Sequence, residues 1–174
     1  MTAVGRDYFL RVKPPEGDAR AEALSLLLPR GSSTGPFLAS YAGRHLDSPG
    51  APDQYVLTGA QWNSFMEELY AREALIRELA DCVISVFDFA PEAPDEIRSP
   101  EPGDWETLAR FEGWVARVFG LSAEGSPEPV FSLDEAHFRR GVCWAWDLLL
   151  WLELDPEIRE ALRDPRKLVF LDVG

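Results

Sequence analysis

Apolar side chains recur at the spacing of an α-helix between Thr58 and Phe87. Thr58 is followed three residues later by Gln61, a pair typical of the capping box at a helix N-terminus. Glu68 precedes Arg72 by four positions, the favourable order for an ion pair on the solvent side of a helix. The sequence therefore predicts one amphipathic helix over residues 58–87. Its apolar positions are Trp62, Phe65, Met66, Leu69, Ile76, Leu79, Val83 and Phe87.

Two further helices are predicted in the C-terminal half of the chain. Asp104 is a good cap for a helix over residues 104–119, and Gly120 follows it as a terminator. Ser132 begins a second capping-box pattern, which predicts a helix over residues 132–154. The second half of that helix is apolar on almost every side, which is typical of a helix in the middle of a fold.

Two shorter helices and a long loop complete this part of the prediction. Asp18 can cap a helix over residues 19–28, a segment rich in alanine and leucine. The dipeptide Asp155-Pro156 is typical of a helix start, and a short helix is expected to follow it to Arg163. Residues 30–54 are rich in glycine, serine and proline, so we expect a loop there.

Short β-branched and aromatic segments at the two ends of the chain predict strands at residues 7–13 and 167–173. These strands could pair, and a further short strand is expected at residues 55–57. The predicted fold class is α+β and mostly helical, with about five helices and a small pairing of the N-terminal and C-terminal strands. We expect a single domain over residues 1–174, with an acidic, proline-rich connection at residues 90–103 inside it.

The charge of the chain limits its partners. It has 17 basic and 30 acidic residues, a formal net charge of −13. Such a surface repels nucleic-acid phosphates and anionic lipids, so we expect no direct binding of nucleic acid or membrane. The chain also starts without the apolar region of a secretory signal, which predicts a cytoplasmic protein. In that compartment Cys82 and Cys143 are expected to be free, buried thiols; the oligomeric state stays open.

Asp147 lies inside the apolar helix segment and has no basic residue one turn away on either side. An unpaired buried carboxylate is unfavourable, so we expect a partner from another part of the chain. Two interpretations stay open. Asp147 forms a buried ion pair, or it is a functional carboxylate in a pocket beside Trp144 and Trp151. Core packing is the simpler explanation for the two tryptophans.

No pattern in the chain indicates a cofactor, a zinc site or a catalytic triad. His45 and His137 stand far apart, and both cysteines occupy core-like positions, so the spacing of zinc ligands is missing. The Gly31–Pro36 loop lacks the Gly-Lys-Ser/Thr ending of a phosphate-binding loop. We therefore expect no cofactor, no metal site and no catalytic residue, although a carboxylate-only site for Mg²⁺ or Ca²⁺ and catalysis itself stay open.

Acidic charge is concentrated in residues 92–135. This segment has 11 acidic residues and three arginines, which gives it a net charge of −8. Such a surface could simply keep the protein soluble, or it could dock a basic protein partner and speed the encounter. The residues proposed to contact the partner are Glu92, Asp95, Glu96, Glu101, Asp104 and Glu106.

Three classes of function fit these patterns. The first is a small acidic binding protein without chemistry, an inhibitor, immunity-type protein or adaptor that masks a basic protein surface. The second is a small-molecule-binding protein or enzyme with a pocket near Asp147 and the tryptophan-rich helix. The third is a component of a larger assembly, which exposed Trp62 or Trp105 would indicate. A cavity that reaches Asp147 favours the second class, and a solid core there favours the first.

Overall fold

The computed structural model describes residues 7–46, 53–85, 96–121 and 135–174. In these ranges the chain forms five α-helices, a four-stranded sheet and a two-stranded sheet, so the predicted mostly helical α+β fold is confirmed. The helices are α1 (Thr34–His45), α2 (Gly59–Ala71), α3 (Glu73–Ala80), α4 (Pro102–Phe119) and α5 (Glu135–Ala161). The strands are β1 (Tyr8–Lys13), β2 (Leu24–Leu27), β3 (Gln54–Leu57), β4 (Val83–Ser85), β5 (Glu96–Ile97) and β6 (Leu168–Val173).

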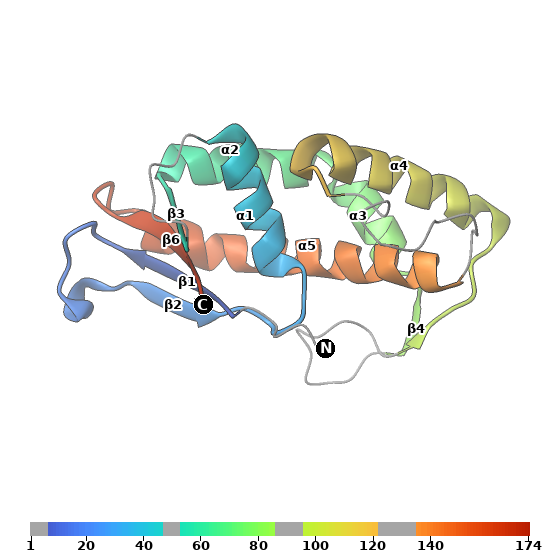
Figure 1. Cartoon of the computed structure of the whole chain (residues 1–174), viewed down its shortest axis with the longest axis horizontal. Coiled ribbons are helices and arrows are strands. Elements are labelled where there is room, and N and C mark those ends of the chain that lie inside the picture. The colour runs from blue at the N-terminus through green and yellow to red at the C-terminus, as the bar shows by residue number, and fades with distance from the viewer. Residues whose placement is uncertain (1–6, 47–52, 86–95, 122–134) are drawn as a thin grey trace.

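The four-stranded sheet is antiparallel throughout, in the order β2-β1-β6-β3. The predicted pairing of the terminal strands is confirmed, because Leu10 of β1 lies opposite Leu171 of β6. The sheet is larger than predicted, since β2 extends one edge and β3 extends the other. It lies at one end of the molecule, and α5 runs away from it along the long axis (Figure 1).

One face of the sheet packs on the helices and the other faces solvent. Leu10, Val12 and Val169 point toward the core and are fully buried. Phe9 and Leu27 lie opposite each other on the outer face, where they are 36% and 59% exposed. Successive side chains of a strand point to opposite faces, so a sheet that is covered on one side requires this alternation.

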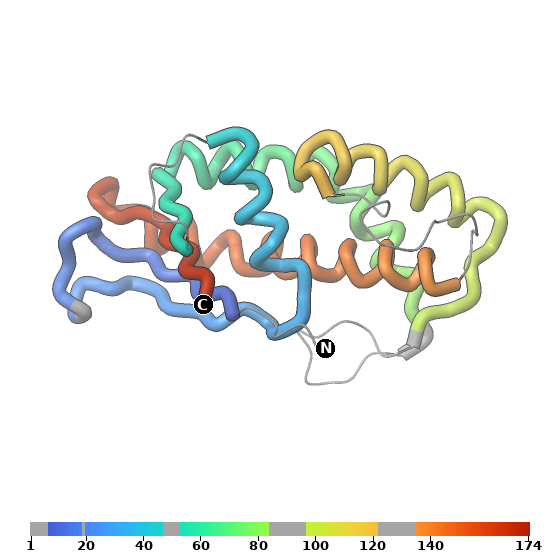
Figure 2. Tube along the Cα trace, in the orientation of Figure 1, coloured from blue at the N-terminus to red at the C-terminus, as the bar shows by residue number. Residues whose placement is uncertain are grey.

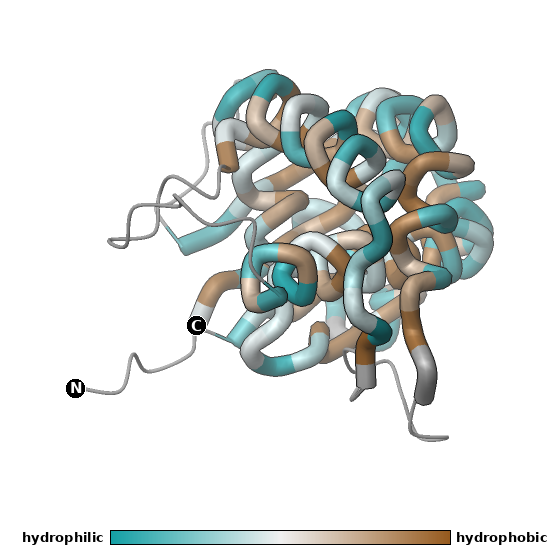
Figure 3. The backbone as a smooth tube through the Cα atoms, turned by 90° about the vertical axis from the view of Figure 1, so that its right-hand side faces the viewer, coloured by the Kyte–Doolittle hydropathy of each residue, from teal (hydrophilic) through white to brown (hydrophobic). Residues whose placement is uncertain are grey.

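Helix α5 is the centre of the helical layer, with α1, α2, α3 and α4 packed against it. It extends through most of the length of the molecule (Figure 2). Hydrophobic and hydrophilic residues alternate along the turns of the surrounding helices (Figure 3). Aromatic rings fill the space between them: the centroids of Trp62 and Trp151 lie 5.6 Å apart, and those of Phe37 and Phe119 lie 5.0 Å apart, both edge to face. Such pairs add to the stabilisation that burial itself provides.

The helix predicted over residues 19–28 is wrong. Apart from a 3₁₀ turn at Ala19–Ala21, this segment contains β2, whose Leu27 pairs with Phe9 of β1. Alanine and leucine are good helix formers, but intrinsic propensities differ by less than about 1 kcal/mol per residue, and the backbone hydrogen bonds of strand pairing override them.

The predicted loop at residues 30–54 contains α1, so this prediction is also wrong. Pro36 lies in the first turn of α1, where the missing N–H group of proline is tolerated. Gly35 is required for packing, because a Cβ atom there would lie 2.3 Å from Cγ of Tyr8. The glycine and proline content hid the helical spacing of the buried residues Phe37, Leu38, Tyr41 and Ala42.

The single helix predicted over residues 58–87 is divided into α2, α3 and β4. The capping box itself is confirmed. The backbone N–H of Thr58 donates to Oε1 of Gln61 at 2.9 Å, and the backbone N–H of Gln61 donates to Oγ1 of Thr58 at 3.1 Å. The helix stops at Arg72, whose backbone angles (φ −116°, ψ 13°) leave the helical region. The predicted end at Phe87 lies outside the described residues.

Helix α4 begins two residues before the predicted start. Glu101 is its N-cap and Pro102 its first residue, the position at which proline is favoured. Asp104, the predicted cap, lies one turn further on, and its carboxylate accepts the backbone N–H of Glu101 at 2.7 Å. The predicted terminator is confirmed, because Gly120 has a φ of 68°, in the left-handed region that favours glycine.

The two predicted helices on either side of Asp155-Pro156 are one, since α5 continues to Ala161. Asp155 is 1% exposed, and its carboxylate accepts hydrogen bonds from Nε1 of Trp62 at 2.8 Å and from the hydroxyl of Tyr70 at 2.6 Å. It therefore joins α5 to α2 instead of capping a new helix. The predicted start at Ser132 lies outside the described residues.

Candidate functional site

A pocket of about 620 Å³ lies where the loop before α1 meets the middle of α5. Residues 29–33 form one wall, and Arg140, Cys143, Trp144 and Asp147 form the other. Pockets of this size are typical of sites for small molecules. The pocket thus reaches Asp147, the condition that favours the second class of function.

The α5 wall is a stripe along one side of the helix. Its residues follow the spacing i, i+3, i+4, i+7, which places them on the same helical face. Arg140 and Asp147 are separated by seven residues, about 10 Å along the axis at the usual rise per residue. The stripe therefore has a cationic group at one end, an anionic group at the other, and the indole ring of Trp144 between them.

The opposite wall is a turn held by its own hydrogen bonds. Gly31 has a φ of 77°, a conformation that side chains rarely adopt. The hydroxyl of Ser32 donates to the carbonyl oxygen of Pro29 at 2.7 Å. The turn leads directly into α1, so the N-terminal end of this helix faces α5.

Asp147 is 7% exposed, and its Oδ2 atom accepts the backbone N–H of Ser33 at 2.9 Å. The prediction that Asp147 is buried and bonded to a group outside its own helix is confirmed. The partner is a backbone donor, and no ion pair among the described residues includes Asp147. Burial raises the pKa of Asp147 to about 6, although the bond from Ser33 opposes this shift.

The two arginines of the pocket differ in their partners. Nε of Arg30 lies 3.0 Å from Oδ1 of Asp7, a surface ion pair. Arg140 is partly buried, and its guanidinium has no ion-pair partner among the described residues. A guanidinium with free N–H groups is a strong donor to carboxylates and phosphates. With no ion pair among the described residues, Arg140 is a cation of this pocket that is available to a ligand.

Cys143 differs from its predicted environment. It is free as expected, but it is only partly buried and lines the pocket, whereas Cys82 is fully buried. Burial raises the pKa of the Cys143 thiol, and the nearby charge of Asp147 raises it further. The Cys143 thiol therefore ionises less readily than a free cysteine does.

The structure separates the tryptophans that the sequence grouped together. Trp144 lines the pocket, where its ring meets Phe37 edge to face at 5.9 Å. Trp151 does not line it; this residue is fully buried and donates from Nε1 to the carbonyl oxygen of Thr34 at 2.8 Å. Of the two tryptophans proposed as markers of an assembly surface, Trp62 is fully buried and Trp105 is partly buried.

Sequence reasoning missed several residues of the pocket. Arg140 and Cys143 carried a usable signal, because their spacing from Asp147 already places them on its helical face. No pattern in the sequence pointed to Arg30 or Ser33 as residues of the pocket. They come from a segment more than 100 positions away that was predicted to be a plain loop.

Among the described residues, the acidic ones proposed for docking a partner do not line this pocket. Glu92 and Asp95 lie outside the described residues, and Glu96 belongs to β5. Glu101 and Glu106 are exposed at the beginning of α4. The described members of this set therefore gather near one end of α4.

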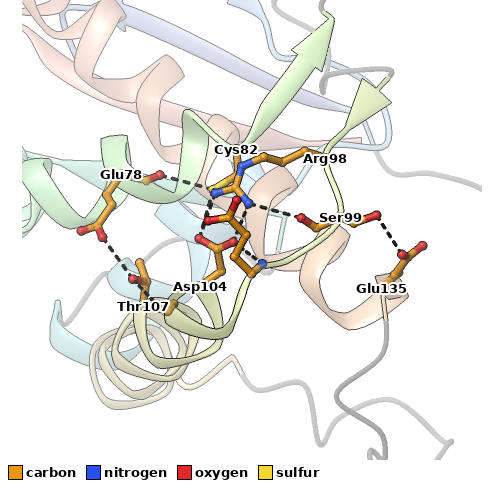
Figure 4. Close-up of polar contacts among 9 residues, drawn as sticks. Glu78, Cys82, Arg98, Ser99, Asp104, Thr107 and Glu135 are labelled. Carbon is orange, nitrogen blue, oxygen red and sulfur yellow. Dashed lines mark hydrogen bonds and ion pairs between the residues drawn. The ribbon is translucent and has the colours of Figure 1, made fainter.

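Asp104 is committed to contacts within the protein. Its Oδ1 atom lies 2.9 Å from a guanidinium nitrogen of Arg98, which lowers the pKa of Asp104. The same guanidinium reaches Sγ of Cys82 at 3.2 Å, so Arg98 joins α4 to the residue before β4 (Figure 4). Ser99 adds a further link, donating to Oε1 of Glu135 at 3.1 Å. These contacts link the first turn of α4, the residue before β4 and the first residue of α5 through Arg98 and Ser99.

The described residues show no group of three metal-ligating side chains. Both histidines have other contacts: Nε2 of His45 lies 2.7 Å from the carbonyl oxygen of Val118, and Nε2 of His137 lies 2.5 Å from Oε1 of Glu112. Among the described helices, none is long and apolar enough to cross a membrane.

No family model, curated protein or solved structure matches the chain. The geometry of the pocket and the chemistry of its lining residues therefore carry the functional assignment.

Proposed function

We propose that this protein binds a small zwitterionic molecule in the pocket between the loop before α1 and the middle of α5. The single observation that carries this proposal is that Asp147 and Arg140 lie at the two ends of the α5 wall of one pocket, each without an ion-pair partner among the described residues. Buried and partly buried charges are usually paired with an opposite charge, so we expect a ligand to supply the two counter-charges.

The carboxylate of Asp147 selects the cationic end of the ligand. An ammonium group close to Asp147 favours the ionised carboxylate and compensates for its burial. Because the pKa of Asp147 is about 6 without a ligand, the carboxylate is mostly ionised at neutral pH. Affinity should therefore weaken as the pH falls below about 6.

Arg140 selects the anionic end. Its guanidinium matches the geometry of a carboxylate, with which it can form two parallel hydrogen bonds. The separation of about 10 Å along α5 between Arg140 and Asp147 sets the length scale of the ligand. Trp144 lies between the two charges, so the middle of the ligand is expected to be apolar.

A titration with ω-amino acids tests this proposal. Calorimetry on the whole chain would compare a series of increasing length, centred on 6-aminohexanoate, with hexylamine and hexanoate, which carry only one charged end. We expect the zwitterions to bind more tightly than either, with an optimum length. The Asp147→Asn and Arg140→Gln variants should each weaken binding about tenfold, which equals about 1.4 kcal/mol.

Arg139→Gln is the matched control, because Arg139 is exposed on the same helix and does not line the pocket. It removes the same charge and should leave affinity unchanged. The proposal fails if the zwitterions bind no better than the singly charged compounds, or if the control weakens binding as much as Arg140→Gln.

A basic protein partner is a second candidate, supported by the exposure of Glu101 and Glu106. Neither residue forms an ion pair among the described residues, and the surrounding segment has a net charge of −8. Rim charges act mainly on association rate. A Glu101→Gln/Glu106→Gln variant should therefore associate more slowly with a partner captured at low salt, and an unchanged rate would remove this candidate.

A further inference from the structure

A second, smaller pocket of about 290 Å³ lies between the start of α3 and the middle of α4. From its chemistry we infer that this pocket binds a phosphate or diphosphate group. It shares no lining residue with the pocket at Asp147, so the two sites can be tested separately. The residues that matter are Arg72, Arg110, Gly113, Trp114 and Arg117.

The polar side chains around this pocket are all hydrogen-bond donors. Three are arginines and the fourth is Trp114, while the other lining residues are apolar or glycine. Arginine has no acceptor atom, and the indole ring of tryptophan only donates. A pocket with three guanidinium groups and no side-chain acceptor is complementary to an anion.

Within the part of the chain that the structure describes, none of the three arginines forms an ion pair. No carboxylate of the described residues lies within 4.0 Å of the side-chain nitrogens of Arg72, Arg110 or Arg117. Arg77 of α3, by contrast, is paired with Glu73 at 3.0 Å. Although the chain has 30 acidic and 17 basic residues, the described carboxylates leave these three guanidinium groups unpaired around one pocket. An anion bound in this pocket would be attracted by all three positive charges.

The α4 residues that line this pocket form a stripe along one face of the helix. Arg110, Gly113, Trp114 and Arg117 follow the spacing i, i+3, i+4, i+7 and thus share one face. A Cβ atom at Gly113 would meet no atom within 4 Å, so the surface is open there. An anion can approach the helix between the two arginines of this stripe. Arg72 comes from the junction of α2 and α3 on the facing side.

Trp114 has an unsatisfied donor. It is 2% exposed, and its Nε1 atom has no hydrogen-bond acceptor among the described residues. Buried indole N–H groups normally find a partner. Trp114 also packs against Phe119 edge to face at 5.5 Å, so it is held in place beside the arginines.

The number of charges favours phosphate over a simple carboxylate. Three guanidinium groups match an anion of charge −2 or more, whereas a carboxylate supplies only −1. Arginine also binds phosphate oxygens through pairs of parallel N–H bonds. The volume of about 290 Å³ holds a phosphate or diphosphate but not a large ligand as a whole.

Calorimetric titration with inorganic phosphate, pyrophosphate and methyl phosphate at low ionic strength tests the inference, because salt screens exposed charges. We expect saturable binding, tightest for pyrophosphate, and weaker binding of acetate. Tighter binding of methyl phosphate than of inorganic phosphate would indicate a phosphate ester as the natural source. Arg110→Gln/Arg117→Gln should weaken pyrophosphate binding by about 100-fold, on the basis of about tenfold for each lost charge-assisted contact.

Gly113→Leu is a second variant that should fold normally, since its side chain enters open space. It should block binding without removing charge. Gly43→Leu is its control, because Gly43 is an exposed helical glycine of α1 at which an added Cβ atom would meet no atom within 4 Å. Arg139→Gln controls for the loss of positive charge. The inference is overturned if no oxyanion binds, or if the controls weaken binding as much as the pocket variants.

Discussion

The backbone N–H of Ser33 donates a hydrogen bond of 2.9 Å to Oδ2 of Asp147, a residue 114 positions later in the chain. This bond joins the beginning of α1 to the middle of α5. The positive end of a helix dipole and a backbone donor both favour the ionised carboxylate. They do not overcome its burial, and the pKa of Asp147 is raised to about 6.

The first prediction concerns the pH dependence of stability. Asp147 holds its proton more tightly in the folded protein (pKa about 6) than in the unfolded chain (3.8), so the folded state binds more protons between these values. The contribution of Asp147 to the free energy of unfolding therefore falls as the pH rises through that window, by roughly 3 kcal/mol in total, and is constant above about 6.

Asp147→Asn isolates this effect, because the amide is neutral at every pH and can still accept the N–H of Ser33. Urea unfolding at several pH values should show that the variant gains stability relative to the native chain as the pH rises from about 4 to about 6. A difference that does not change with pH would show that Asp147 is not the titrating group.

The second prediction concerns Asp155. Asp155→Ala removes the acceptor for Trp62, Tyr70 and Arg159, and leaves the buried N–H of Trp62 without a partner. The free energy of unfolding should fall by about 3 kcal/mol or more. Glu160→Ala, which breaks an exposed ion pair between the last turn of α5 and Arg163, should have a far smaller effect in the same urea titration. Equal losses would refute the role assigned to Asp155.

The third prediction compares two glycines of α1. Gly35→Ala places a Cβ atom against the ring and Cβ of Tyr8 and should lower the free energy of unfolding by about 1–3 kcal/mol. The Cβ atom added by Gly43→Ala would have no atom within 4 Å. This variant should raise the free energy of unfolding by up to about 1 kcal/mol, since alanine favours the helix. Thermal unfolding should therefore shift in opposite directions for the two variants. Shifts in the same direction would contradict the packing of Tyr8 on α1.

The fourth prediction concerns the two thiols. Cys143 lines the pocket and is partly exposed, whereas Cys82 is 4% exposed, so iodoacetamide should modify Cys143 first in the native protein. Both thiol pKa values are raised, mainly by burial, so the reaction should be slow at neutral pH and faster in alkali. Mass spectrometry of the digested protein identifies the site, and Cys143→Ser is the control. Equal labelling of both cysteines would contradict their assigned environments.

Local patterns in the sequence were sufficient for the features that depend on neighbouring residues. The capping box of Thr58 and Gln61 is an interaction over three positions, and the end of α4 at Gly120 depends on the backbone freedom of one residue. The burial of Asp147 was predictable for the same reason, because its helical neighbours are apolar and a helix brings them together in every fold.

Tertiary contacts decided the remaining features. Residues 24–27 are a strand because β1 lies beside them, and α5 continues past Pro156 because α2 supplies donors to Asp155. The partner of Asp147 and the pocket that surrounds it depend on where the loop at residues 29–33 is placed. The free energy of these contacts comes from groups far apart in the chain, and it exceeds the weak local preferences that a sequence pattern reports.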